Sequence, residues 1–177
     1  MLIHRAIEFA TLKHQGQYRK GTKTPYIVHP MEVMQILTAN GCGEEVVVAG
    51  ILHDTLEDTK TTKEELTYYF GERVAELVAC ETEDKTKSWQ ERKQSTIDRL
   101  KSAEYAVKLI RCADQLANIR SLFDNVKLEG EKTWTHFKAG KKETEWYYRG
   151  VTGALGELAD LDMYQELCYY IRIVFAD

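Results

Sequence analysis

Residues 46–54 read VVVAGILHD, a nearly continuous apolar run that ends in His53 and Asp54. Glu44 and Glu45 precede the run, and negative charge suits the N-terminal end of a helix. A helix that is apolar on almost every side is buried rather than half exposed. The stretch therefore predicts a central, buried helix that delivers a histidine and an aspartate from the core.

The rest of the chain also favours helices. Pro25 and Pro30 are its only prolines, and apolar residues mostly recur at spacings of three and four rather than in strict alternation. A length of 177 residues is enough for one domain with a full core. We expect a single all-α domain over residues 1–177. The further helices are expected over residues 2–12, 30–39, 62–70, 72–80, 91–100, 105–122, 135–158 and 161–175, with loops or polar breaks at 14–23, 81–90 and 126–133.

Composition excludes several functional classes. No apolar run approaches the roughly 18 to 20 residues needed to span a bilayer, so a membrane function is not expected. The net charge is −4, which provides no general attraction for nucleic acid. The cysteines show no C-x-x-C spacing, and no signal peptide precedes them, which favours a reduced cytoplasmic protein. They are Cys42, Cys80, Cys112 and Cys168.

Four residues stand out by their position, each at a helix end or on an apolar helix face. Asp114 lies among apolar residues of the predicted 105–122 helix, where a carboxylate is costly unless it is paired or binds metal. His29 directly precedes Pro30, which suits the first turn of a helix. Mixed nitrogen and oxygen ligands suit manganese, iron or zinc, and the absence of cysteine argues against a structural zinc site. The candidate metal ligands are His29, His53, Asp54 and Asp114.

The loop at residues 14–23 contains two glycines, three cations and an aromatic residue. A solvated connection is one interpretation. The alternative is a ligand loop in which Arg19 stacks on a base and Lys20 meets a phosphate. The loop alone leaves both open.

Several separated motifs resemble one family. The order of His29, His53, Asp54 and Asp114 is similar to that of the HD phosphohydrolase superfamily. The surrounding sequence resembles, more specifically, the hydrolase domain of RelA/SpoT-type stringent-response proteins over about residues 1 to 150. The motifs are HQGQYRKGT at 14–22, PYIVHP at 25–30, HDTLEDT at 53–59, FG at 70–71 and ADQLANIR at 113–120. The chain is thus similar to a stand-alone small alarmone hydrolase, a type also found in animals.

The resemblance implies an HD-domain helical bundle with a metal site between central helices. It also implies a Mn²⁺-dependent enzyme that removes the 3′-diphosphate of ppGpp or pppGpp and releases pyrophosphate with GDP or GTP. Glu57 and Asp58 match the family's acidic catalytic pair, which orients or deprotonates the attacking water. The metal ligands that it implies are the four candidates named above.

The nucleotide contacts also follow from matching positions. Arg19 would stack on guanine, Lys20 would touch phosphate, and Asn118 would lie near the ribose. Lys85 and Lys93 are candidate phosphate contacts, and Lys87 and Arg92 are further cations for this strongly anionic substrate. The match is loose at residues 88–90 and 138–147, so the aromatic contacts, with Trp146 and Tyr147 as candidates, stay open.

Other interpretations remain. An HD-type phosphatase could act on another nucleotide, such as an adenosine alarmone or NADPH. A catalytically inactive nucleotide sensor belongs to a different class, but it predicts damage to the metal ligands or the acidic pair, and all six residues are present. A helical protein with an accidental acidic patch would not produce five separated motifs. The sequence leaves open whether the protein forms a homo-oligomer.

Overall fold

The computed structural model describes residues 1–81, 86–137 and 139–176. These residues form ten α-helices and two 3-10 helices, and they contain no strand beyond one isolated bridge between Tyr18 and Pro25. The all-α prediction is confirmed. The helices are α1 (Leu2–Lys13), α2 (Val28–Ala39), α3 (Glu44–Leu52), α4 (Thr55–Asp58), α5 (Lys63–Phe70), α6 (Glu72–Glu81), α7 (Trp89–Lys101), α8 (Tyr105–Glu129), η1 (Gly130–His136), α9 (Gly140–Ala154), η2 (Gly156–Leu158) and α10 (Asp162–Val174).

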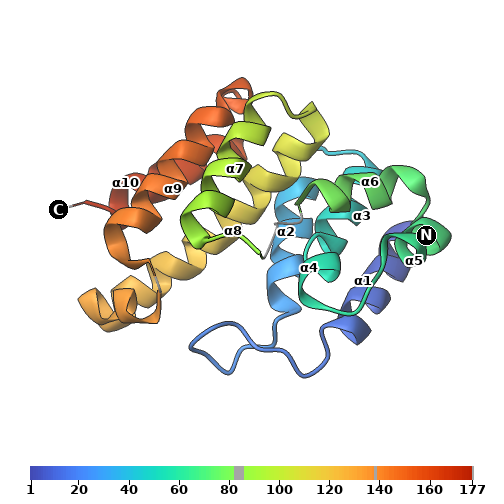
Figure 1. Ribbon diagram of the computed structural model, residues 1–177, viewed down its shortest axis with the longest axis horizontal. Helices are drawn as coiled ribbons and strands as arrows, with labels where there is room; N and C mark the ends of the chain where they lie inside the picture. The colour runs from blue at the N-terminus through green and yellow to red at the C-terminus, as the bar shows by residue number, and fades with distance from the viewer. Residues whose placement is uncertain (82–85, 138, 177) are drawn as a thin grey trace.

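Two helices organise the bundle. α3 packs against α1, α2, α6 and α8, and its residues 47–52 are all buried. α8 is the longest helix and crosses the molecule, with α1, α3, α5 and α6 to one side and α7, α9 and α10 to the other (Figure 1). The central, buried position predicted for the 44–52 helix is therefore confirmed. None of the described helices is both long and apolar enough to cross a bilayer.

Gly50 sets the distance between α2 and α3. A side chain at this position would collide with Leu37 and would approach Val33 Cγ1 to 3.2 Å. Because glycine leaves this space empty, the two helices pack closely. His29 on α2 and His53 at the C-terminal end of α3 are thereby brought into contact.

Several helix boundaries differ from the predictions. α7 begins at Trp89 rather than at residue 91, because Ser88 and Glu91 form a capping box. α8 continues through the predicted polar break to Glu129, where Gly130 ends it with a φ of 58°. The 3-10 helix η1 follows and buries Trp134 against Phe175, so α9 starts five residues later than expected and ends at Ala154.

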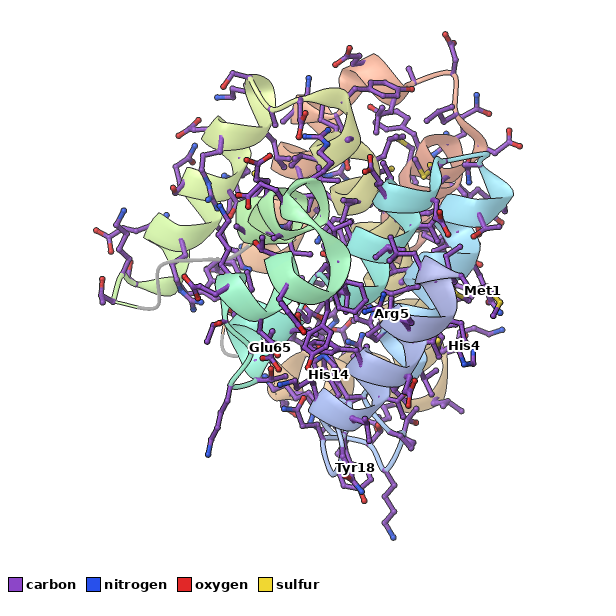
Figure 2. The ribbon with its side chains drawn as sticks, turned by 90° about the vertical axis from the view of Figure 1, so that its right-hand side faces the viewer. Met1, His4, Arg5, His14, Tyr18 and Glu65 are labelled. Atoms are coloured by element: carbon purple, nitrogen blue, oxygen red, sulfur yellow. The ribbon has the colours of Figure 1, made fainter. Side chains whose placement is uncertain are left out.

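The loop at residues 14–23 is more ordered than a solvated connection. Arg19 N donates to Thr24 O at 2.9 Å, and Tyr26 N donates to Gln17 O at 2.9 Å, which closes the loop into a hairpin-like turn. Figure 2 shows Tyr18 on this projecting turn and Glu65 beside α1. Lys13 Nζ, near the C-terminal end of α1, pairs with Glu65 of α5 at 2.7 Å. The base of the loop is therefore fixed to the core.

Candidate active site

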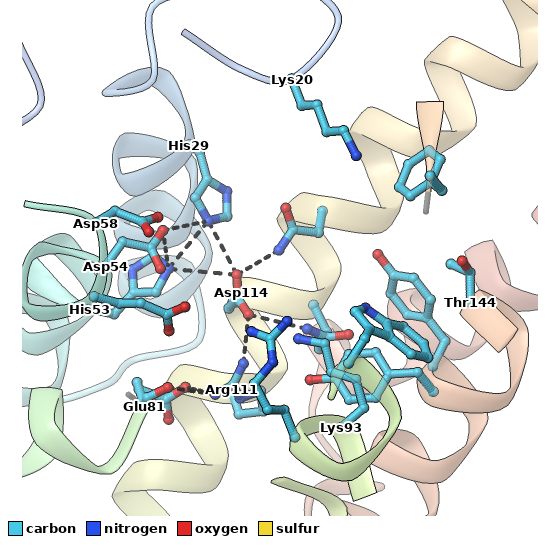
Figure 3. A pocket seen from close by; sticks show the side chains of 18 of the residues that line it. Lys20, His29, His53, Asp54, Asp58, Glu81, Lys93, Arg111, Asp114 and Thr144 are labelled. Carbon is cyan, nitrogen blue, oxygen red and sulfur yellow. Dashed lines mark hydrogen bonds and ion pairs between the residues drawn. The ribbon is translucent and has the colours of Figure 1, made fainter. Parts of the chain in front are cut away.

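A cavity of about 360 Å³ opens beside the C-terminal end of α3. One part of its lining holds histidines and carboxylates, among them His53, Asp54 and Asp114. Other parts carry cations and aromatic rings (Figure 3). Its walls come from α2, α3, α4, α6, α7, α8 and α9 and from the loop before α2. Segments far apart in the sequence thus contribute to a single site.

The four candidate metal ligands meet at this cavity. His29 Nε2 lies 3.3 Å from His53 Nε2 and 3.2 Å from Asp114 Oδ1. Asp54 Oδ2 lies 3.0 Å from His53 Nε2 and 3.6 Å from His29 Nε2. Both histidines are buried, and the ligand atoms of His29, His53 and Asp114 all lie within 4.8 Å of one another. His29, His53 and Asp114 could therefore hold a metal ion together, and the Asp54 carboxylate lies beside them.

His53 presents a ring nitrogen that could bind a metal. His53 Nδ1 lies 2.8 Å from the carbonyl oxygen of Gly50, which only accepts hydrogen bonds, so Nδ1 carries the proton. The lone pair of neutral His53 is then on Nε2, the atom that faces His29 and the two aspartates. A hydrogen bond of this kind fixes the ring and its tautomer in metal sites. The nitrogen and oxygen donors therefore fit a divalent cation.

The electrostatics of the metal-free cluster also favour a cation. Burial opposes the charged form of His53, but Asp54 and Asp114 outweigh this effect and raise its pKa well above the ordinary value. Burial likewise opposes ionisation of Asp114, yet hydrogen bonds from His29 and His53 hold its pKa well below the usual range. Asp114 is buried and Asp54 is partly buried, and carboxylates in such surroundings are tolerable only beside positive charge, which either protons or a bound metal can provide.

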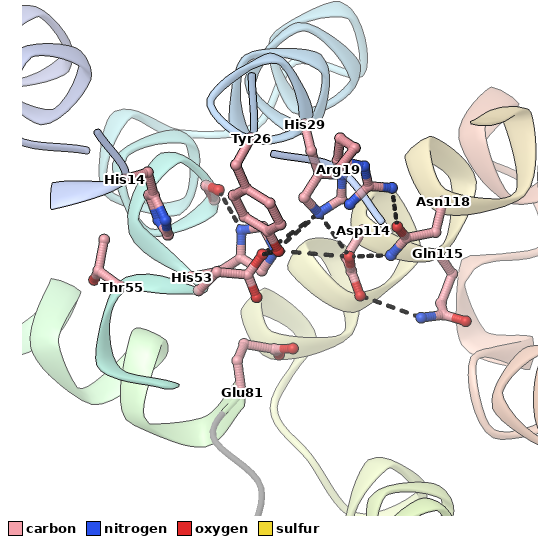
Figure 4. Close-up of polar contacts among 12 residues, drawn as sticks. His14, Arg19, Tyr26, His29, His53, Thr55, Glu81, Asp114, Gln115 and Asn118 are labelled. Carbon is pink, nitrogen blue, oxygen red and sulfur yellow. Dashed lines mark hydrogen bonds and ion pairs between the residues drawn. The ribbon is translucent and has the colours of Figure 1, made fainter. Parts of the chain in front are cut away.

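Asp54 has a further partner that the sequence did not assign. The Tyr26 hydroxyl donates to Asp54 Oδ2 at 2.6 Å (Figure 4). Burial and the charge of Asp54 raise the pKa of Tyr26, so the hydroxyl keeps its proton and remains a donor. The ring of Tyr26 packs against buried His14 with centroids 5.0 Å apart. Its place three residues before His29, within the PYIVHP motif, was the available signal.

Asp114 is held by three side chains of its own helix. Asn118 Nδ2 donates to Oδ1 at 2.7 Å, whereas Gln115 Nε2 and Arg111 Nη1 donate to Oδ2, each at 3.2 Å. Arg111 also pairs with buried Glu81 at the end of α6. Burial raises the pKa of Glu81, and Arg111 opposes that shift.

Neither member of the Arg111–Glu81 pair was singled out from the sequence. Arg111 lies three residues before Asp114, a spacing that could have suggested a contact on one helix face. Glu81 lies at the start of a charged segment, where nothing indicates burial.

Glu57 and Asp58, the predicted acidic pair, lie on the short helix α4 and line the cavity. In Figure 3 the Asp58 carboxylate lies close to Asp54 on the acidic side of the site. Gln17 Nε2 donates to the carbonyl oxygen of Asp58 at 2.8 Å and so connects α4 to the loop before α2. The structure therefore places Glu57 and Asp58 on the same cavity as the four candidate metal ligands.

Two of the predicted nucleotide contacts, Lys20 and Asn118, line the same cavity, and Arg19 lies beside them. Arg19 Nη2 donates to Asn118 Oδ1 at 2.7 Å, and its guanidinium lies 5.6 Å from the centre of the Tyr26 ring. Lys20 reaches into the cavity from the loop (Figure 3) and lies 5.6 Å from the Phe137 ring centre. A second cavity of about 400 Å³ includes Arg19 and shares Lys20, Tyr26 and Asn118 with the first. The two cavities therefore adjoin each other at Lys20, Tyr26 and Asn118.

The wall opposite the candidate metal ligands comes from α7 and α9. Lys93 Nζ lies 4.7 Å from the centre of the Tyr147 ring, and both residues line the cavity together with Arg92 and Trp89. Trp89 is a lining residue that sequence reasoning did not select. Three further residues named from the sequence are not found in this wall. Trp146 and Lys87 do not line the cavity, and Lys85 lies outside the described residues.

Comparisons with known proteins show the family to which the chain belongs. The human guanosine-3′,5′-bis(diphosphate) 3′-pyrophosphohydrolase MESH1 is 38% identical over 160 residues, which cover 89% of this chain and 87% of that protein. The Xenopus tropicalis protein of the same name is 43% identical over 68% of this chain and 69% of its own length. A solved structure described as a metazoan ortholog of SpoT that hydrolyses ppGpp superposes with a TM-score of 0.83 at 29% identity, covering 97% of this chain and 94% of that one. A Listeria monocytogenes crystal structure gives 0.79 at 36% identity, covering 84% and 99%. The HD domain family model matches residues 6–145, and the chain belongs to the HD domain family.

Proposed function

We propose that the protein is a divalent-metal-dependent hydrolase that removes the 3′-diphosphate of ppGpp or pppGpp. The observation that carries this proposal is the cluster of two histidines and two aspartates, which faces a cavity whose other walls hold Lys20, Arg92 and Lys93. A tetra-anionic or more highly charged nucleotide needs both a metal and cations in an acidic protein. Relatives that are named for this reaction cover most of the chain.

The residues of the site have separate roles in the proposed reaction. His29, His53, Asp54 and Asp114 would hold a divalent cation, which would supply a Lewis acid for the phosphoryl oxygens and lower the pKa of water. Glu57 and Asp58 line the cavity beside these ligands and are placed to orient the attacking water and accept its proton. The water oxygen forms a bond to the phosphorus next to the ribose 3′ oxygen, the bond between that oxygen and phosphorus breaks, and a proton goes to the 3′ oxygen. The products are pyrophosphate and GDP or GTP.

The nucleotide is held on the other walls. Arg19 stacks on the guanine from the second cavity, and Asn118 lies near the ribose. Lys20, Arg92 and Lys93 meet the phosphates. We propose Mn²⁺ as the metal, since nitrogen and oxygen ligands without cysteine suit it. The four cysteines are free thiols, which suits a reducing cytoplasm.

A nucleotide panel tests the function. Purified protein with Mn²⁺ is incubated with ppGpp, pppGpp, an adenosine alarmone and NADPH, and the products are separated by ion-exchange chromatography. We expect pyrophosphate with GDP or GTP from the first two. The variant Asp54→Ala should abolish turnover and reduce the bound metal. Turnover of another nucleotide without release of pyrophosphate from ppGpp would overturn the assignment.

A further inference from the structure

The two carboxylate oxygens of Asp114 have different surroundings. Oδ1 lies 3.2 Å from His29 Nε2 and 3.6 Å from His53 Nε2, on the side of the proposed metal. Oδ2 points away from the histidines and accepts hydrogen bonds from Arg111 Nη1 and Gln115 Nε2. One oxygen is therefore available to a metal while the other fixes the orientation of the carboxylate.

Arg111 connects this carboxylate to a second helix. Its Nη1 donates to Asp114, while its Nη2 lies 2.5 Å from Glu81 Oε2 and 3.4 Å from the Glu81 carbonyl oxygen. Only 7% of Arg111 and 5% of Glu81 are exposed. A planar guanidinium holds two partners in fixed directions, which the single ammonium of lysine does not do. The guanidinium thus spans the gap between the end of α6 and the middle of α8.

The charges explain why Glu81 is needed. A lone buried guanidinium one hydrogen bond away from Asp114 would repel a divalent cation. Glu81 balances this charge, so Arg111 can orient Asp114 without making the site more positive. A buried ion pair is costly to desolvate, and well-packed apolar residues are often as stable or more stable in its place. The stability of the fold is therefore a weak explanation for this pair.

We propose that Arg111 and Glu81 form a positioning pair for the metal site, in which Arg111 orients Asp114 and Glu81 neutralises Arg111. The proposal rests on the metal site of the proposed function. Neither residue is required to touch the nucleotide. Partners behind metal ligands typically change metal affinity by about 10- to 100-fold when they are removed.

The test compares three variants by metal binding without nucleotide. Mn²⁺ affinity is measured by electron paramagnetic resonance titration, and the visible spectrum of bound Co²⁺ reports the ligand geometry. Arg111→Met removes the orienting group, and Glu81→Gln leaves its charge unbalanced, so each should weaken Mn²⁺ binding by about 10-fold or more. The double variant Glu81→Gln/Arg111→Met restores charge balance without restoring orientation.

The double variant separates positioning from stability. We expect the melting temperature of its metal-free form to return to near the wild-type value, whereas Mn²⁺ binding stays at least about 10-fold weaker and the Co²⁺ spectrum stays altered. A double variant that binds Mn²⁺ as tightly as the wild type would overturn the proposal. So would an Arg111→Lys variant with unchanged affinity and spectrum, because lysine lacks the planar fork.

A matched control comes from another ion pair between α6 and the start of α8. Arg73 binds Glu104 through two hydrogen bonds of 2.9 Å, and both residues are exposed. Arg73→Met/Glu104→Gln should leave Mn²⁺ affinity unchanged. If the proposed function is wrong but the positioning pair is right, the results differ. The Arg111 variants would still weaken metal binding, while the wild type would not hydrolyse ppGpp.

Discussion

Arg19 and Asn118 lie 99 positions apart in the sequence, yet the Arg19 guanidinium donates a 2.7 Å hydrogen bond to Asn118 Oδ1. The same asparagine donates through Nδ2 to Asp114 Oδ1 at 2.7 Å. Asn118 therefore connects the loop that carries the proposed base contact to a proposed metal ligand. Neither contact is made through the backbone, so side-chain substitutions can separate them.

Substitution of Arg19 and substitution of Asn118 should have different effects. Arg19→Ala should raise KM for ppGpp by about 10-fold or more through lost stacking, with Mn²⁺ affinity unchanged. Asn118→Ala should raise KM and also weaken Mn²⁺ binding by about 10-fold, because Asp114 loses a hydrogen bond. Steady-state kinetics and Mn²⁺ titration measure the two effects. Unchanged metal affinity in Asn118→Ala would contradict the connection.

The acidic pair should be separable from the metal ligands. Glu57→Gln and Asp58→Asn should each lower kcat by about 10²- to 10⁴-fold, since the water loses its proton acceptor or its orientation. The bound metal, measured by mass spectrometry after gel filtration, should stay at the wild-type level. Asp54→Asn is the comparison, and it should lose both activity and metal. Metal loss in the Glu57 variant would instead place that residue among the ligands.

Tyr26 offers a test of a single hydroxyl. Tyr26→Phe retains the ring that packs on His14 but removes the donor to Asp54. We expect metal affinity to fall by about 10-fold, with a small change in melting temperature. Tyr18→Phe is the control, because Tyr18 is 60% exposed on the loop. Equal effects of the two substitutions would show that the hydroxyl of Tyr26 has no special role.

Metal removal should destabilise the fold. Chelation leaves Asp54 and Asp114 without their metal, and ligand-linked stabilisation is lost. We expect the melting temperature to be higher by roughly 5–10 °C with Mn²⁺ at about 100 times its Kd than in the chelated protein. Differential scanning calorimetry measures the shift. The variant His53→Ala should show no such response, and a shift of equal size in that variant would place the stabilising metal elsewhere.

Gly50 should be intolerant of a side chain. Gly50→Ala should lower the free energy of unfolding by about 1–3 kcal/mol, because the added methyl group overlaps Leu37. Gly153→Ala on α9 is the matched control, since a side chain there meets nothing within 4 Å. The control should be neutral or up to about 1 kcal/mol more stable, because alanine favours helices. Urea denaturation followed by circular dichroism measures both changes.

The sequence was most informative where ionisable residues stand next to or within apolar segments. A histidine and an aspartate after an apolar run, and an aspartate within an apolar helix face, are unusual enough to identify residues that the structure brings together. His53 Nε2 lies 3.0 Å from Asp54 Oδ2 and 3.6 Å from Asp114 Oδ1. The helical pattern similarly predicted α3 at its correct position. These signals are local, so a single sequence is sufficient to read them.

The contacts that depend on tertiary packing could not be predicted from the sequence. Glu81 begins a charged segment, and only the return of α8 past the end of α6 makes it a buried partner of Arg111. Trp89 was assigned to a loop. Its place in the cavity wall could not be predicted, because it requires α7 to pack against α9. The extension of α8 to Glu129 was missed because residues 126–133 are polar on average, although Val126 packs on the core.

The separation between the loop and the buried cluster has a consequence for the evolution of substrate choice. His29, His53 and Asp114 belong to helices that pack in the core, so changes near them disturb the whole fold. Arg19 is only partly buried and Lys20 is exposed, and both lie on a turn that is held mainly at its base. Under the proposed function, changes at residues 15–24 would alter which base is recognised, while a lineage inherits the buried histidines and aspartate intact.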